Sequence, residues 1–137
     1  MYDATPCFPP EQHQLWCMYA SRPVGVPISA SIDERRRFLM HPCYVMLNEG
    51  RVRGGAWIDR ISEEDIAHFH ILVDRGFRRH ASALLEFLHE DQQKKCEGLF
   101  VHWGKRPLKD DPSAFFKRHG YAVNSVPELG GSAEYRF

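Results

Sequence analysis

Apolar residues follow a strand-like pattern through the middle of this chain. Residues 43–47, 52–61 and 66–73 form three strongly apolar runs, and polar turns at residues 48–50 and 62–65 separate them. Runs of this length joined by short turns predict three antiparallel strands in a row. The third run is too apolar for an exposed edge, so we expect it in the middle of the sheet.

The spacing changes to that of a helix over residues 79–95. Apolar side chains recur there on one face and charged side chains on another. The apolar face carries Leu84, Leu85 and Leu88. Gly98 ends the turn out of the helix, and residues 99–103 form the next apolar run. Because a long helix joins this run to residues 66–73, we expect the two strands to be parallel.

The two ends of the chain predict the remaining elements. Residues 1–10 are expected to be loop-like because prolines remove amide donors there, and no convincing strand precedes Glu11. Short helices are expected at residues 11–20, 33–40 and 112–120, and a final hairpin of residues 121–123 and 133–137 around the turn Gly130-Gly131. Together these elements predict a single α+β domain with a mixed, mostly antiparallel sheet of about six strands flanked by about four helices.

Composition narrows the classes of protein to which this domain can belong. The chain has 137 residues, 43% of them hydrophobic, and its 18 lysines and arginines balance 18 acidic residues. A chain of this size forms one domain, and balanced charge provides no overall field that would attract nucleic acid or an anionic membrane. No run is long and apolar enough to span a bilayer, and the chain does not begin with a signal segment. We therefore expect a cytoplasmic protein.

The step from the third strand to the long helix is the strongest chemical signal. It contains the basic residues Arg75, Arg78, Arg79 and His80, followed by the small residues Ala81, Ser82 and Ala83. Amides in the first turn of a helix have no intrahelical acceptor, and the helix dipole favours an anion there. Basic residues at a helix start are unfavourable unless an anion is bound. The stretch therefore favours a phosphate site, with a nucleic-acid or acidic partner surface and a solvated helix start as alternatives.

Candidate acid–base residues lie on the third strand. His68 and His70 share one face of it, because alternate residues of a strand point the same way. An imidazole that titrates near neutrality can take a proton from an ammonium group. The alternative is that both are hydrogen-bonded residues of the sheet. Tyr121 and Tyr44 are candidate acids, with packing in the core as the alternative role for each.

The cysteines indicate no further site. Cys7, Cys17, Cys43 and Cys96 lack paired spacing, which is typical of free thiols in a reducing compartment. No combination of them with histidine has the spacing of a common zinc site, so we predict no metal.

Two motifs follow one another in this order of elements. Arg78-Arg79-His80-Ala81-Ser82-Ala83, after a strand that ends at Val73, is similar to the pyrophosphate loop [Gln/Arg]-x-x-Gly-x-[Gly/Ala]. Residues 114–121 are similar to the segment Ala-x-x-Phe-Tyr-x-x-x-Gly-Phe. In these motifs and in element order, residues 43–137 resemble the GNAT superfamily of acyl-CoA-dependent N-acyltransferases.

The resemblance implies a function and a set of binding residues. The amides of residues 79–83 would hold the pyrophosphate of acetyl-CoA, and the backbone of Ile71, Leu72 and Val73 would pair with its pantetheine arm and polarise the thioester. His68 or His70 would deprotonate the amine acceptor, a small molecule or a protein. The loop between the first two helices, residues 22–31, would line the acceptor site.

Two residues depart from the family pattern. Ala81 stands at a glycine position of the loop, and Phe116 stands where the family has the tyrosine that protonates the leaving thiolate. The sequence therefore leaves two functions open. One is an acyl-CoA-dependent N-acyltransferase. The other is a GNAT-fold protein that binds protein partners without catalysis, similar to the short GNAT-like proteins of tailed bacteriophages and their virions. The final strands of the family often pair between subunits, so a homo-oligomer fits either function.

Overall fold

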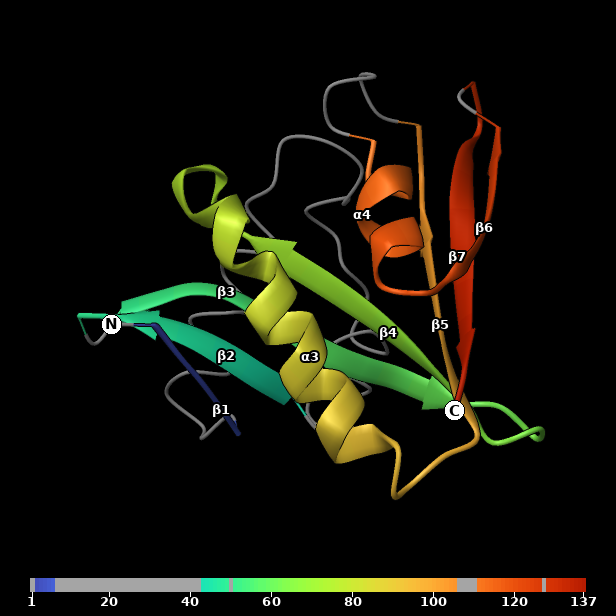
Figure 1. The fold of residues 1–137 in the computed structure, drawn as a ribbon, viewed down its shortest axis with the longest axis horizontal. Coiled ribbons are helices and arrows are strands. Elements are labelled where there is room, and N and C mark those ends of the chain that lie inside the picture. The colour runs from blue at the N-terminus through green and yellow to red at the C-terminus, as the bar shows by residue number, and fades with distance from the viewer. Residues whose placement is uncertain (1, 7–42, 50, 106–110, 127) are drawn as a thin grey trace, which may run out of the picture.

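The structure, a computed structural model, describes residues 2–6, 43–49, 51–105, 111–126 and 128–137. Seven strands, two α-helices and one 3-10 helix make up this part of the chain (Figure 1). In chain order they are β1 Tyr2–Pro6, β2 Cys43–Asn48, β3 Arg51–Ile61, β4 Ile66–Val73, η1 Arg75–His80, α3 Ala81–Gln92, β5 Gly98–Trp103, α4 Ser113–Arg118, β6 Ala122–Val126 and β7 Gly130–Arg136.

The described strands belong to one mixed sheet with the order β1-β2-β3-β4-β5-β7-β6. Neighbours in this order are antiparallel except β4 and β5, which are parallel. The predicted α+β class is thus confirmed, together with the antiparallel run of three strands, the parallel pair and the central place of β4. The sheet has seven strands where the sequence predicted about six, and the additional strand is β1.

β1 corrects the prediction that residues 1–10 form a loop. Its five residues pair with β2, from Tyr2↔Asn48 to Pro6↔Tyr44. β1 lies at the edge of the sheet, and Pro6 is its last residue, so the missing amide of the proline interrupts no inner ladder. Proline disrupts an inner strand but is tolerated in an edge strand. The sequence pattern does not show which strand lies at the edge, so β1 was not predicted.

The helices begin and end at different residues from those predicted. The helix expected at residues 79–95 starts earlier, as the 3-10 helix η1, and its α-helical part ends at Gln92. The basic residues therefore lie in a 3-10 helix that leads directly into the α-helix. The helices predicted at residues 11–20 and 33–40 lie outside the described residues.

The final hairpin also differs from the prediction. Gly130 and Gly131 begin β7 instead of forming the turn, because the pairs Val126↔Gly130 and Ser125↔Gly131 are still part of the ladder. Gly130 must be glycine because its φ is +110° and because an added Cβ would lie 2.1 Å from the carbonyl oxygen of Trp103 on β5.

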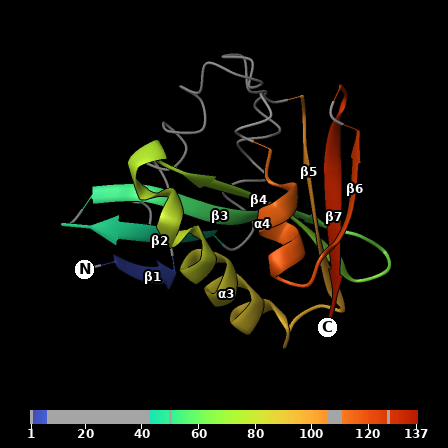
Figure 2. The ribbon, with the colours of Figure 1, turned by 45° about the horizontal axis from the view of Figure 1, so that its top comes forward.

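α3 and α4 pack on the same face of the sheet and enclose one core (Figure 2). The three leucines predicted to face inward from α3 are fully buried, whereas Glu86 and Glu90 are exposed. On β4, Ala67 and Phe69 belong to this core. Because side chains of a strand alternate between faces, His68 and His70 lie on the opposite face of the sheet.

Candidate functional site

β4 and β5 diverge and form a fork in the middle of the sheet (Figure 1). The ladder between them covers three residue pairs and ends at His68↔Phe100. β4 nevertheless stays paired with β3 up to Val73, and β5 stays paired with β7 up to Trp103. β5 therefore offers no partner to the backbone of residues 69–73. Backbone N–H and C=O groups that face such an opening need another partner.

The junction between β4 and α3 is held against β3 at the open end of the fork. The amide of Asp74 donates to the carbonyl oxygen of Arg53 at 2.7 Å, and the Asp74 carboxylate lies 3.4 Å from Arg53 Nη1. The Arg53 guanidinium also lies over the ring of Phe77, 5.0 Å from its centroid. These contacts fix the start of η1 and so place the first turn of α3.

α3 begins without a side-chain cap and without an acidic residue in its first turn. Ala81 has a φ of −61° and its amide donates to the carbonyl oxygen of Arg78, so a helical residue fits here and glycine is not required. The amides of Ser82 and Ala83 lie in the first turn of α3, which itself supplies them no acceptor, directly after the carbonyl groups of η1. This helix start has the donors and the dipole that an anion needs.

Basic side chains from two helices surround this start. Arg78 and Arg79 are exposed, and Arg79 Nε donates to Nε2 of His80 at 3.0 Å. Ser82 Oγ lies 3.1 Å from Nε2 of His119, which brings the basic end of α4 to the first turn of α3. The positive charge predicted from one stretch of sequence is therefore extended by a second helix.

Phe116 packs between the two arms of the fork. Its ring stacks on Trp103 of β5 with the centroids 5.6 Å apart, and it meets Phe69 of β4 edge-on at 6.4 Å. Phe116 is 1% exposed. The residue that replaces the family's tyrosine is thus a buried packing residue with no group that could donate a proton.

Three histidines gather on the other face of the sheet, at the point where the fork opens. The rings of His70 on β4 and His102 on β5 are 5.9 Å apart. His70 also stacks on Trp57 at 5.3 Å, and its Nε2 lies 3.9 Å from a carboxylate oxygen of Asp59. His68 packs against Phe100 of β5 at 4.8 Å. We call His68, His70 and His102 the histidine cluster.

Loss of solvent and like charges keep two members of the histidine cluster neutral. The pKa of His68 is lowered by burial and then by the charges of Arg60 and His102, against a smaller opposite effect of Asp59. The pKa of His102 is lowered by partial loss of solvent, then by His70. A neutral imidazole accepts a proton, so the cluster is prepared for general-base chemistry at pH 7.

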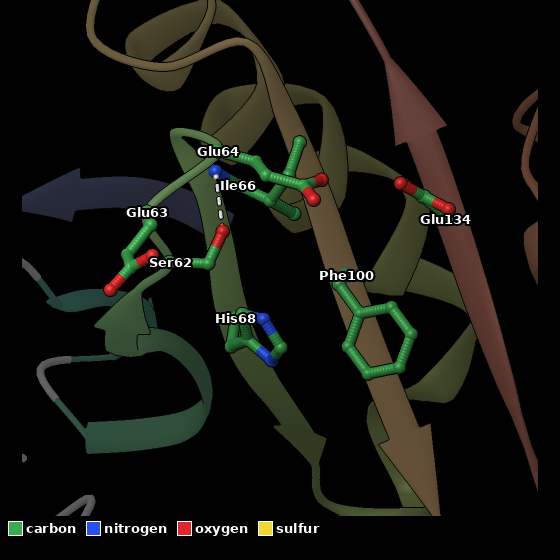
Figure 3. A pocket seen from close by; sticks show the side chains of 7 residues that line it. All are labelled: Ser62, Glu63, Glu64, Ile66, His68, Phe100 and Glu134. Atoms are coloured by element: carbon green, nitrogen blue, oxygen red, sulfur yellow. Dashed lines mark hydrogen bonds between the residues drawn. The ribbon is translucent and has the colours of Figure 1, made fainter.

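A cavity of about 420 Å³ opens beside the cluster (Figure 3). It is lined by Ser62, Glu63, Glu64, Ile66, His68, Phe100 and Glu134. Arg136 lies 2.9 Å from a carboxylate oxygen of Glu134 and 3.8 Å from one of Glu64, and so partly neutralises the acidic wall. Through His68 the histidine cluster reaches this open cavity.

The two candidate tyrosines are not brought to the histidine cluster. The Tyr121 hydroxyl is 2.6 Å from Nε2 of His89 in the core on the α3 face, and burial raises its pKa. The Tyr44 hydroxyl donates to Asp91 and accepts from Gln92 at 2.6 Å, and burial raises its pKa too. Both tyrosines lie across the sheet from His68 and His70.

The contact between His89 and Tyr121 predicts a pH-dependent stability. Burial, and then the charge of His119, lower the pKa of His89 to about 4, from 6.5 when unfolded. The unfolded chain therefore binds this proton first, and the stability from neutral His89 is full above pH 6.5 and is lost as the pH falls towards 4.

We expect His89→Gln to reduce this pH dependence. Urea midpoints measured between pH 7 and pH 4.5 should fall less steeply in the variant than in the wild type. Equal slopes for the two proteins would contradict the assignment.

Solved structures share this fold over nearly the whole chain. The GNAT domain of PAT from S. lividans has a TM-score of 0.75 at 17% identity, with 99% of this chain and 90% of that chain covered. A GNAT-family acetyltransferase from Staphylococcus aureus Mu50 has 0.73 at 10% identity, with 99% of each chain covered. The ribosomal-protein-S18-alanine N-acetyltransferase of Escherichia coli has 0.69 at 12% identity, with 98% and 91% covered. The chain has the GNAT fold.

The structural comparison supports the GNAT resemblance that the motifs and the order of elements indicate. No protein-family model matches the sequence, and no curated protein matches it. The comparison gives no support to the predicted resemblance to phage proteins. No helix in the described part of the GNAT fold is long and apolar enough to cross a membrane. Within the same residues, no group of three or more His, Cys, Asp or Glu side chains could hold a metal ion.

Two residues at the histidine cluster, His102 and Asp59, were not predicted from the sequence. His102 could have been found from the alternation of side chains along the two parallel strands. In the parallel register His68 lies beside Phe100, so the next residues on the same face are His70 and His102. Asp59 gave no signal, because β3 and β4 are irregular in register between Ile58 and Arg60.

Proposed function

We propose that the protein is an acyl-CoA-dependent N-acyltransferase that transfers an acyl group directly to an amine. The observation that carries the proposal is the fork. An inner strand of a sheet opens its backbone to a ligand, an uncapped helix start with basic side chains lies at the open end, and a cluster of imidazoles lies where the opening begins.

Acetyl-CoA fits the residues along the fork. The first-turn amides of Ser82 and Ala83 are donors for its pyrophosphate, with Arg78 and Arg79 adding exposed positive charge. The backbone of Ile71, Leu72 and Val73, which β5 does not pair, offers donors and acceptors to the pantetheine amides and to the thioester carbonyl. Acetyl-CoA supplies an activated acyl group, and these residues hold and orient it.

The histidine cluster supplies the base. Most amines are protonated at neutral pH and attack a carbonyl carbon only after they lose a proton. His70 and His68 lie on the same face of β4 and beside the start of the opening, within the part of the fold that the thioester would reach. Either imidazole can take the ammonium proton directly or through one water.

A thermal-shift titration with acetyl-CoA tests binding. A ligand that binds only the folded state stabilises it by about 2.7 kcal/mol at a hundredfold excess over Kd. We therefore expect the Tm to rise by about 8 °C at saturating acetyl-CoA. Matched additions of adenosine and of pantetheine alone, which lack the pyrophosphate, should raise the Tm much less.

Acyl transfer itself is tested with acetyl-CoA and separate primary amines, namely tyramine, spermidine and lysine methyl ester. The expected result is release of CoA thiol together with the acetylated amine, both measured by mass spectrometry. Absence of any Tm shift at millimolar acetyl-CoA would refute the proposed function. A shift without transfer to any amine would show a protein that binds the cofactor and does not catalyse.

A further inference from the structure

Two imidazoles from different strands flank the point where the fork opens. We propose that His102 of β5 acts with His70 of β4 as a proton-transfer pair across the fork. The role rests on the acyl transfer proposed above. It gives a defined step in the reaction to His102, which the sequence did not indicate as a base.

The strand register places the pair. β4 and β5 are parallel and pair up to His68↔Phe100, so His70 and His102 are the next residues on the same face of each strand. Their ring centroids are 5.9 Å apart although the backbones have begun to separate. A group that enters the fork on this face therefore meets an imidazole from each arm.

Neighbouring side chains on β3 hold one imidazole and set the charge of the pair. Trp57 stacks on His70, and a carboxylate oxygen of Asp59 lies 3.9 Å from its Nε2. Partial loss of solvent lowers the pKa of His102 most, the positive neighbours His70 and Arg60 lower it further, and Asp59 opposes them. Two imidazolium ions this close repel each other, so the pair holds one proton more readily than two.

One exchangeable proton is what the reaction requires. An ammonium acceptor carries three protons and the product amide carries one, so two protons must leave the nitrogen. The first goes to neutral His102 before the nitrogen attacks the thioester carbon, and His102 releases it to solvent. The second leaves the nitrogen after the N–C bond forms, passes to His70, and is returned to the CoA sulfur as the C–S bond breaks. The pair therefore carries one proton at a time.

We assign the acid role to the pair because neither tyrosine position considered from the sequence supplies a donor here among the residues that the structure describes. Phe116 has no hydroxyl, and the Tyr121 hydroxyl is bonded to His89 on the opposite side of the sheet. His68, the third member of the histidine cluster, lines the open cavity and interacts electrostatically with His102, so it offers the released proton a route to water.

Steady-state rates of three variants test the pair. We expect His70→Gln and His102→Gln each to lower kcat by about 100-fold, the lower end of the usual effect of a general acid or base. The Kd for acetyl-CoA should stay within about twofold, and the double variant should lose little more than the worse single variant, because the two residues act as a unit. His89→Gln, on the opposite face, is the control and should keep its kcat.

A histidine titration followed by NMR tests the coupling without activity. In the free protein, His70→Gln should raise the pKa of His102 because a like charge is removed, and Asp59→Asn should lower it. An unchanged His102 pKa in both variants would overturn the pair. An active wild type in which His102→Gln keeps its full kcat would overturn the inference and leave the proposed function standing, whereas a wild type without acyl transfer would overturn both.

Discussion

Replacing Ala83 with glutamate is expected to weaken acetyl-CoA binding strongly and to leave the fold intact. Ala83 is exposed in the first turn of α3, and its amide is one of the proposed pyrophosphate donors. A carboxylate there is favourable for the helix dipole, so the free protein should be as stable as the wild type or slightly more so. The same carboxylate repels the pyrophosphate, and a like-charge contact costs about 3 kcal/mol or more.

That free energy corresponds to a Kd for acetyl-CoA raised by at least about 100-fold. Isothermal titration calorimetry measures it, and the Tm of the free variant shows that the fold is retained. Ala83→Gln has the same length without the charge and should lose much less affinity, and Ala83→Ser should bind like the wild type. A glutamate variant that keeps its affinity would place the pyrophosphate elsewhere.

The sequence was informative where the structure depends on local spacing. The bounds of β4 were predicted to the residue, and the inward-facing leucines of α3 are buried as expected. Both follow from apolar periodicity over a few residues. The prolines and glycines were less reliable, because their effect depends on place in the sheet. Pro6 ends an edge strand, and Gly130 is paired in a ladder.

The candidate site depends on contacts that local patterns do not contain. The fork exists because β4 and β5 stop pairing after His68↔Phe100 while each keeps its other neighbour. No run of residues signals that departure. His102 meets His70 only through the register of two strands that a helix separates in the chain. The basic residues of η1 and the small residues that begin α3 were found from sequence because they are contiguous in the chain.

The tyrosine replacement shows how the two kinds of information combine. The sequence identified Phe116 as the position of a missing acid. The structure adds that its ring fills the space between Phe69 and Trp103 and is almost fully buried. A hydroxyl restored there would have to find a partner inside an aromatic core. The phenylalanine at this position therefore contributes to the packing between the two arms of the fork.

Replacing Gly130 with alanine is expected to unfold the last hairpin and to weaken the whole domain. Gly130 has a φ of +110°, and an added Cβ would lie 2.1 Å from the carbonyl oxygen of Trp103 and 2.9 Å from backbone atoms of Gly104. Neither obstacle is a flexible side chain, so β7 or the end of β5 would have to move. Backbone strain and this displacement should lower the free energy of unfolding by about 3 kcal/mol or more.

The effect should reach the fork because Trp103 is its β5 arm and stacks on Phe116. We expect the Tm of Gly130→Ala to fall by about 10 °C. The tryptophan bands in near-ultraviolet circular dichroism should lose intensity because Trp103 is packed less rigidly. Gly76→Ala is the matched control, since a Cβ there meets no atom within 4 Å, and its Tm should change by no more than about 2 °C. A Gly130→Ala variant as stable as the control would contradict the close contact between the backbone of Gly130 and that of Trp103.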